Sequence, residues 1–282
     1  MSDEMIRPGE GRGLFGGDPA AYDRGRPAYP ARVFDVLEEE AGLGPGAHIL
    51  DVGAGTGLAT LELARRGAAS IVAVEPNARM AQQLRKNAAA SSAGATSDAI
   101  EVIEAAFEDY DPPAGSFDLV TAATSFHWID EATGLAKARV GLRAGGTIAL
   151  WWHVFGDPEQ DDPFHEATRA RLAVGRHSPS GGEPGGPRHA LDVDARTGAL
   201  RAAGFVDVRH ERMHETTRFT PAQLRDLYST FSNTAHLSPD ERDELLDYIE
   251  ETAANDFGGE VERPLVLSLY VAGSSATARG SR

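Results

Sequence analysis

The 282-residue sequence contains no cysteine, few aromatic residues and no long apolar run. The lack of cysteine excludes disulfides, a thiolate nucleophile and any metal site with sulfur ligands. No apolar stretch approaches the roughly 18 residues that a membrane span needs, and the polar, glycine-rich start lacks a signal-peptide core. We therefore expect a cytoplasmic protein with no membrane partner.

Basic residues are also scarce. Lys and Arg number 27 against 43 Asp and Glu, which gives a formal net charge of −16. Nucleic-acid binding depends on clustered basic side chains, and this sequence has no Lys/Arg-rich run, so no nucleic-acid partner is expected. The nine histidines show no metal-ligand spacing, and we expect no metal.

The most informative segment that is present runs from Ile49 to Gly57 and reads Ile-Leu-Asp-Val-Gly-Ala-Gly-Thr-Gly. An apolar strand meets an acid, Asp51, and then a turn with glycine at every second position. Glycine allows positive φ and lets a ligand approach the backbone closely, so the segment predicts a nucleotide-cofactor loop. A dinucleotide loop of the form G-x-G-x-x-G would need glycine or alanine at position 58, where this chain has Leu58.

A second signal is the apolar, β-branched run from residue 70 to residue 74, which predicts a buried parallel strand. It ends in Glu75 and Pro76. A carboxylate at the end of this strand can accept hydrogen bonds from both hydroxyls of a ribose. Because NAD-binding folds also place an acid there, Glu75 indicates a ribose without identifying the cofactor.

Gly-x-Gly-x-Gly after an apolar strand and an acid resembles motif I of the class I S-adenosylmethionine-dependent methyltransferases of the small-molecule type. Two further segments resemble this family: Ala106-Phe107-Glu108, which in the family lies near the adenine, and the stretch from Ser116 to Val120 that leads to Thr124-Ser125-Phe126-His127-Trp128. The resemblance covers residues 22–150 and implies S-adenosylmethionine as cofactor. The cofactor-binding residues are then expected to be Tyr22, Arg26, Asp51, Gly53, Ala54, Gly55, Gly57, Glu75, Pro76, Ala106, Phe107, Glu108 and Thr124.

The segment from Tyr22 to Pro30 also resembles an N-terminal segment of these enzymes. Arg26 could pair with the carboxylate of the cofactor or of an acidic substrate, and Tyr22 could close over the methyl donor. A proline-fixed connector with solvated charges is the alternative. Tyr29, Trp128 and His153 are predicted to contact the substrate.

His127 is the candidate catalytic residue, because it follows the fourth predicted strand, at the sheet edge where ligands bind. A neutral histidine can take a proton from a hydroxyl or amine during methyl transfer. It could instead shape the pocket floor, and no base is needed if the acceptor is a carboxylate or an activated carbon. We expect in-line displacement without metal, with catalysis mainly by proximity and orientation.

Strands and helices alternate along the chain, which predicts an α/β fold with a doubly wound parallel sheet. The resemblance to the methyltransferases implies that this sheet is of their Rossmann-like type, seven-stranded and mostly parallel with an antiparallel last strand. Strands are expected at 49–52, 70–74, 99–104, 117–122, 147–152, 205–209 and 265–272. Helices are expected at 30–40, 58–67, 78–90, 130–141, 161–174, 194–203, 221–231 and 239–254. Residues 1–20 lack periodicity and are expected to be mobile or draped on the surface, and residues 178–188 to form a mobile loop.

Three domains are expected: an N-terminal gating segment (1–29), a cofactor-binding core (30–155), and the remaining core strands with an inserted helical substrate cap (156–282). The predicted function is methyl transfer to oxygen, nitrogen or carbon of a small-molecule metabolite by a monomer or homodimer. One alternative is a protein that binds the cofactor without transferring methyl, or that uses the fold for another reaction. A nicotinamide oxidoreductase is a weaker alternative because of Leu58.

Overall fold

The computed structural model describes residues 5–91, 99–172, 177–182 and 185–274. In chain order the elements are α1 (Pro8–Leu14), α2 (Pro19–Gly25), α3 (Ala31–Glu40), β1 (His48–Val52), α4 (Leu58–Arg65), β2 (Ser70–Val74), α5 (Ala78–Ala90), β3 (Ile100–Ile103), β4 (Phe117–Ala123), η1 (Phe126–Trp128), α7 (Glu131–Gly141), β5 (Leu142–Phe155), α8 (Pro163–Leu172), η2 (Pro179–Gly181), η3 (His189–Leu191), α9 (Val193–Ala202), β6 (Phe205–Phe219), α10 (Pro221–Ser229), α11 (Ser232–Ala235), α12 (Pro239–Asn255) and β7 (Val261–Ser274).

The seven strands form one sheet in the order β3-β2-β1-β4-β5-β7-β6. Strands β3, β2, β1, β4 and β5 are parallel neighbours, and antiparallel pairing follows at the edge formed by the last strands. Strand β4 is buried along almost its whole length, as expected for a parallel strand covered on both faces. The predicted doubly wound α/β fold is confirmed.

The chain divides into two compact units, and β5, β6 and β7 contribute residues to both. The core unit comprises Tyr29–Trp152, Ala190–Glu211 and Leu269–Arg282. The helical unit comprises Met1–Ala28, His153–His189 and Arg212–Ser268.

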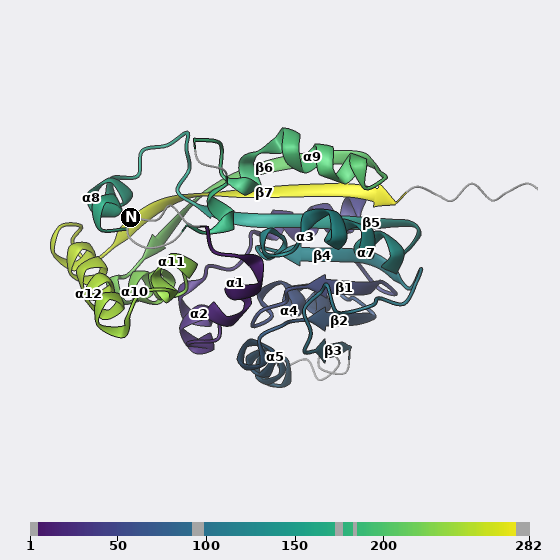
Figure 1. Ribbon diagram of the computed structural model, residues 1–282, viewed down its shortest axis with the longest axis horizontal. Helices are drawn as coiled ribbons and strands as arrows, with labels where there is room; N and C mark the ends of the chain where they lie inside the picture. Colours follow the sequence, from purple (N-terminus) through teal and green to yellow (C-terminus); the bar gives the residue numbers. More distant parts are fainter. Residues whose placement is uncertain (1–4, 92–98, 173–176, 183–184, 275–282) are drawn as a thin grey trace, which may run out of the picture. The chain divides into compact units, whose positions relative to one another are not determined.

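In the core unit, helices pack on the parallel strands: α4 on β2, α5 on β3 and α7 on β4 (Figure 1). Helix α5 shows why the sequence folds this way locally. The side chain of Asn77 caps its first turn, and Met80, Ala81, Leu84 and Ala88 form the buried face.

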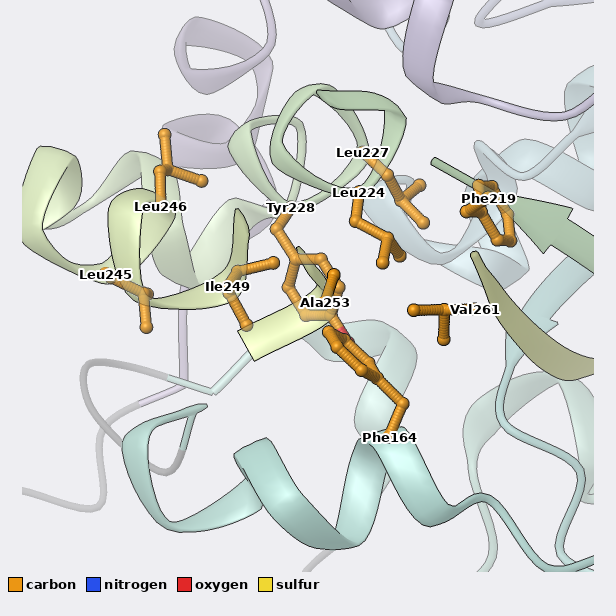
Figure 2. Packing of buried hydrophobic residues seen from close by; sticks show 10 residues of the cluster. All are labelled: Phe164, Phe219, Leu224, Leu227, Tyr228, Leu245, Leu246, Ile249, Ala253 and Val261. Atoms are coloured by element: carbon orange, nitrogen blue, oxygen red, sulfur yellow. The ribbon is translucent and has the colours of Figure 1, made fainter. Parts of the chain in front are cut away.

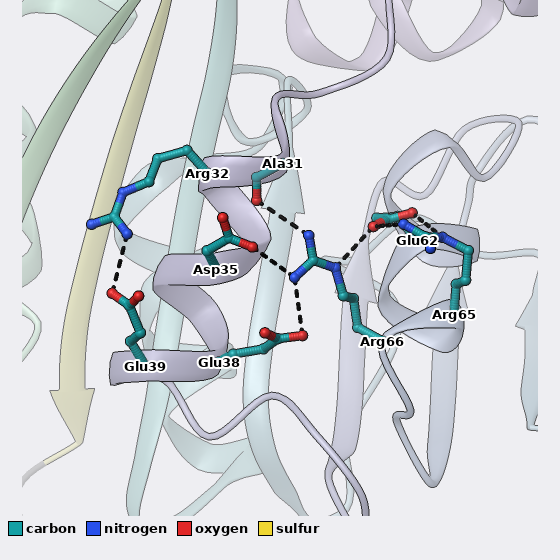
Figure 3. A network of polar contacts seen from close by, with 8 residues as sticks. All are labelled: Ala31, Arg32, Asp35, Glu38, Glu39, Glu62, Arg65 and Arg66. Atoms are coloured by element: carbon teal, nitrogen blue, oxygen red, sulfur yellow. Dashed lines mark hydrogen bonds and ion pairs between the residues drawn. The ribbon is translucent and has the colours of Figure 1, made fainter.

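Helix α3 is tied to α4 by a network of ion pairs around Arg66 (Figure 3). The guanidinium of Arg66 lies 2.7 Å from Asp35 and 3.1 Å from Glu38 on α3, and 3.0 Å from Glu62 on α4. An isolated surface pair contributes little, whereas a network that shares one partly buried cation holds two helices together. These contacts join the helix that precedes β1 to the helix that follows it.

The helical unit has its own apolar core, built from α8, α10, α12, the end of β6 and the start of β7 (Figure 2). Phe164, Tyr228 and Ile249 meet at its centre, and all three are almost fully buried. At one edge of this unit α2 packs closely against α10, with Gly25 at the contact.

The structure corrects the prediction for the start of the chain. Residues 1–20 were expected to be mobile or draped on the surface. In the structure, residues 5–25 contain the helices α1 and α2. Both helices are seven residues long and begin at a proline, and their glycines and short length hide the apolar period. In α2, Asp18 caps the first turn by accepting hydrogen bonds from the N–H groups of Ala20 and Ala21.

Three strands exceed their predicted ranges by several residues. Strand β6 continues ten residues beyond its predicted end through mostly polar side chains, because an edge strand does not need continuous apolar residues. Strands β5 and β7 also extend beyond their predicted ranges at both ends. Of the predicted loop at 178–188, residues 179–181 form η2, and residues 183 and 184 lie outside the described residues.

Among the described residues, no helix is both long enough and apolar enough to span a membrane.

Candidate functional site

The candidate site lies at the carboxyl ends of β1, β2 and β4 in the core unit. Val52 pairs with Val74 on β2, and Asp51 pairs with Thr121 on β4. The loops that follow these three strands therefore leave the sheet at the same edge. In open parallel sheets this edge is where ligands bind.

The glycine loop turns sharply after β1. Gly53, Gly55 and Gly57 have φ of +68°, +60° and +95°, values that other residues rarely adopt. The N–H groups of Gly53 and Ala54 donate to the carbonyl oxygen of Val74 at 2.8 and 3.1 Å. A Cβ atom on Gly53 would lie 2.5 Å from the Cβ of Ser125, so the turn also needs glycine for space.

Glu75 is held against this loop. Its Oε2 accepts a hydrogen bond from the N–H of Gly55, and its Oε1 accepts one from the N–H of Asn77, both at 2.8 Å. The side chain is buried, which raises its pKa above the ordinary value, as does the nearby Asp51; the two N–H groups act in the opposite direction. Each carboxylate oxygen can accept a further hydrogen bond. The oriented carboxylate can thus receive two more donors, the number that a ribose diol offers.

Asp51 occupies a different position, fully buried behind the loop. Its Oδ2 accepts from the hydroxyl of Thr60 on α4 at 2.6 Å, and its Oδ1 accepts from the hydroxyl of Thr121 on β4 at 2.8 Å. Burial raises its pKa. In this geometry Asp51 joins β1, which precedes the glycine loop, to α4, which follows the loop, and to β4.

Thr124 follows β4 with φ of +54°, which is unusual for a β-branched residue and is typical of functional sites. The surrounding contacts hold it there: its N–H donates to the carbonyl oxygen of Trp151 at 2.7 Å, and its hydroxyl receives a hydrogen bond from Tyr29 at 3.1 Å. The next hydroxyl, that of Ser125, donates to the carbonyl oxygen of Val52 at 2.6 Å. Two predicted site residues, Tyr29 and Thr124, are thus brought together.

His127 and Trp128 lie in η1, both nearly buried, with ring centroids 5.2 Å apart. The indole Nε1–H of Trp152 donates to Nδ1 of His127 at 3.0 Å. Because an indole nitrogen can only donate, Nδ1 carries no proton in this arrangement, and the proton of the neutral ring is on Nε2. Proton uptake at Nδ1 would require loss of the Trp152 hydrogen bond.

The segment after β3 forms a tight turn. The N–H of Asp109 donates to the carbonyl oxygen of Ala106 at 3.0 Å, and the ammonium of Lys137 donates to that of Glu108 at 2.6 Å. Phe107 is buried within this turn, whereas Pro76 after β2 is exposed.

Three predicted site residues belong to the helical unit. Arg26 donates from Nε to the hydroxyl of Thr230 at 2.8 Å, and its guanidinium lies 5.1 to 5.2 Å from the ring centroids of Tyr22, Phe155 and Phe231. His153 lies with Nε2 3.4 Å from Glu215. The predicted contact between Arg26 and a ligand carboxylate stays a prediction.

Several residues of this site were not predicted: Thr60, Thr121, Ser125 and Trp152. Their positions result from tertiary pairing, although a buried acid such as Asp51 must find donors and thus indicates nearby hydroxyls. Thr56 in the glycine loop was also not selected. Its hydroxyl is buried and has no hydrogen-bond partner among the described residues, so a ligand at the loop could supply one.

The described residues contain no group of three or more His, Cys, Asp or Glu side chains that could hold a metal ion.

The sequence is similar to those of known methyltransferases. Residues 49–146 match a family model described as a methyltransferase domain. An uncharacterized methyltransferase of Mycobacterium tuberculosis is 28% identical over 240 residues, which is 85% of this chain and 85% of that protein. The malonyl-[acyl-carrier protein] O-methyltransferase of Geobacter sulfurreducens is 33% identical over 234 residues, covering 79% of this chain and 80% of the relative.

Among solved structures, a phosphoethanolamine N-methyltransferase of Haemonchus contortus in complex with S-adenosylhomocysteine has a similar fold. The TM-score is 0.51 at 15% identity, and the match covers 86% of this chain and 52% of that longer protein.

Proposed function

The chain belongs to the class I S-adenosylmethionine-dependent methyltransferases, and from this membership we propose that it methylates an oxygen, nitrogen or carbon atom of a small-molecule metabolite. Its cofactor is S-adenosylmethionine. The identity of the acceptor and the assignment of cofactor contacts to individual residues are part of this proposal.

The orientation of the Glu75 carboxylate is the observation on which the assignment of cofactor contacts rests. Its carboxylate is oriented by the N–H groups of Gly55 and Asn77 at the carboxyl end of β2, and each oxygen can still accept one hydrogen bond. We propose that these oxygens accept the two ribose hydroxyls of the cofactor. Within 4 Å of a Cβ atom at Gly55, the part of the chain that the structure describes places only Met80, at 3.8 Å, which leaves the loop backbone open to a ligand.

S-adenosylmethionine supplies, when bound, a methyl group on a positively charged sulfur, and this group needs no metal to leave. The protein then has to bind and orient the cofactor and the acceptor, and to exclude water from them. Most of the rate acceleration would therefore come from proximity and orientation. Glu75 and the glycine loop fix the nucleoside. Thr124, held at positive φ by Tyr29 and Trp151, provides a rigid backbone next to it.

The affinity for S-adenosylhomocysteine is expected to fall as the pH is lowered from 7 toward ~4. A protonated Glu75 could no longer accept from both hydroxyls, and because burial raises its pKa above 4.5, the loss begins at a higher pH than for an exposed glutamate. Calorimetric titration across this range checks the expectation. The Glu75→Gln variant keeps Asp51, whose pKa is also raised, so an equal pH dependence in this variant would assign the effect to Asp51 instead.

The acceptor class is tested by label transfer. We expect protein incubated with methyl-labelled S-adenosylmethionine and a metabolite extract to place label in the small-molecule fraction. Label found only in protein or nucleic acid would contradict the proposal. Tight binding of the cofactor without transfer to any fraction would favour a cofactor-binding protein that does not transfer methyl.

A further inference from the structure

The hydrogen bond between Trp152 and His127 restricts what His127 can do. Trp152 lies on β5 and is almost completely buried, and its Nε1–H donates to Nδ1 of His127 at 3.0 Å. A buried indole N–H that lost this partner would be left unsatisfied, which is unfavourable. The pair is therefore expected to persist.

Trp152 is itself held in place by neighbouring strands of the core unit. The ring of Tyr270 on β7 packs edge-on against it at 6.0 Å, and the hydroxyl of Tyr270 donates to the carbonyl oxygen of Ala190 at 2.8 Å. On β6, His210 stacks on Tyr270 at 4.5 Å. This row of rings leaves the indole little freedom to turn its N–H away from His127.

We propose that Trp152 is a positioning residue that keeps His127 in its Nε2–H form, and that His127 donates a hydrogen bond to the methyl acceptor rather than removing a proton from it. The reason is chemical: with Nδ1 occupied by a donor, a neutral imidazole has no other lone pair available. This inference rests on the proposed function, because it assigns His127 a role in methyl transfer.

The donor role points to a class of acceptor. An alcohol would need a base to take its proton. In an amine, the lone pair that must attack the methyl group would instead accept the hydrogen bond from His127. A carboxylate has no proton to lose and accepts hydrogen bonds on both oxygens. One carboxylate oxygen would form the new C–O bond with its lone pair, while the electrons of the broken C–S bond stay on sulfur. The anion becomes a neutral methyl ester and the sulfonium a neutral thioether, so charge and atoms balance.

The tautomer can be measured in the wild-type protein without knowing the acceptor. Nitrogen-15 NMR of histidine-labelled protein, with the His127 signals identified by their absence in His127→Gln, is expected to show an unprotonated Nδ1 and a protonated Nε2. Trp152→Phe should release this preference. The control Trp151→Phe should not, because the indole N–H of Trp151 has no hydrogen-bond partner among the described residues. A protonated Nδ1 in the wild type would overturn the proposal.

Turnover of labelled S-adenosylmethionine with the metabolite extract shows whether His127 acts as a hydrogen-bond donor or as a base. His127→Gln keeps an N–H group near the position of Nε2, whereas His127→Asn keeps only an acceptor for Trp152. If His127 donates, the Gln variant should stay within about tenfold of wild type and exceed the Asn variant. If it is a base, both should lose about 10²- to 10⁴-fold.

The labelled product gives an independent readout. A methyl ester releases its label as methanol in mild alkali, and we expect this result. A base-stable N- or C-methyl product would overturn the acceptor class. An Nε2–H tautomer in a protein that transfers no methyl to any fraction would refute the proposed function, and with it the role of His127 in transfer.

Discussion

Replacing Asp162 with alanine is expected to lower the free energy of unfolding by about 3–5 kcal/mol, because it leaves a buried cation without its counter-ion. Asp162 and Arg263 are 8% and 2% exposed, and the carboxylate accepts from Nε of Arg263 at 2.8 Å. The guanidinium also donates from Nη1 to the hydroxyl of Tyr228 at 2.7 Å, at the centre of the core in Figure 2. Asp162 also caps α8 by accepting from the N–H of His165.

Urea denaturation of three variants tests this explanation. Asp162→Ala combined with Arg263→Met should be more stable than Asp162→Ala alone, since the second change removes the unpaired charge. The matched control is Glu244→Ala, which breaks an exposed pair with Arg171 and should change stability by less than about 1 kcal/mol. A double variant no more stable than Asp162→Ala would show that the loss comes from the helix cap or from packing.

Replacing Gly25 with alanine is expected to destabilise the protein by about 2 kcal/mol or more, although alanine is the better helix former by ~1 kcal/mol. Gly25 is the last residue of α2, where a Cβ atom would lie 2.4 Å from the backbone nitrogen of Leu227 and 2.6 Å from the carbonyl carbon of Asp226. These are backbone atoms of α10, so no side-chain rotation relieves the clash. The two helices would have to separate.

Gly198 provides the control for helix propensity. It lies inside α9, and a Cβ atom there would meet no described atom within 4 Å. Gly198→Ala should therefore be neutral or stabilising, by up to ~1 kcal/mol. Thermal and urea unfolding of both variants give the comparison. If both substitutions stabilised the protein, the close contact between α2 and α10 would be contradicted.

The α/β fold could be predicted because each core element carries its own local signal. Helix α5 was predicted with its observed limits, since Asn77 caps it and strong helix formers follow. The strand β2 is a short, mostly β-branched run that is followed by Glu75. Such signals depend only on residues that are close in the sequence, so they can be recognised without knowledge of the tertiary structure.

The remainder of the site depends on residues that meet only in the folded chain. Thr60 and Thr121 bind Asp51 from positions 9 and 70 residues away, and Trp152 reaches His127 across 25 residues. No local pattern indicates such pairs. In the same way, β6 could not be followed beyond Arg209, because a polar edge strand has no apolar period to detect.

Titration of S-adenosylhomocysteine into the wild type, Glu75→Gln, Glu75→Ala and Glu104→Ala tests the central claim most directly. Glu104 follows β3 as Glu75 follows β2, but it is exposed and pairs with Arg85, so it controls for the loss of a carboxylate at a strand end. We predict micromolar binding to the wild type and to Glu104→Ala, with a loss of about tenfold in Glu75→Gln and about 100-fold in Glu75→Ala. Equal affinity in all four proteins, or no binding to the wild type, would contradict the assignment of the cofactor site.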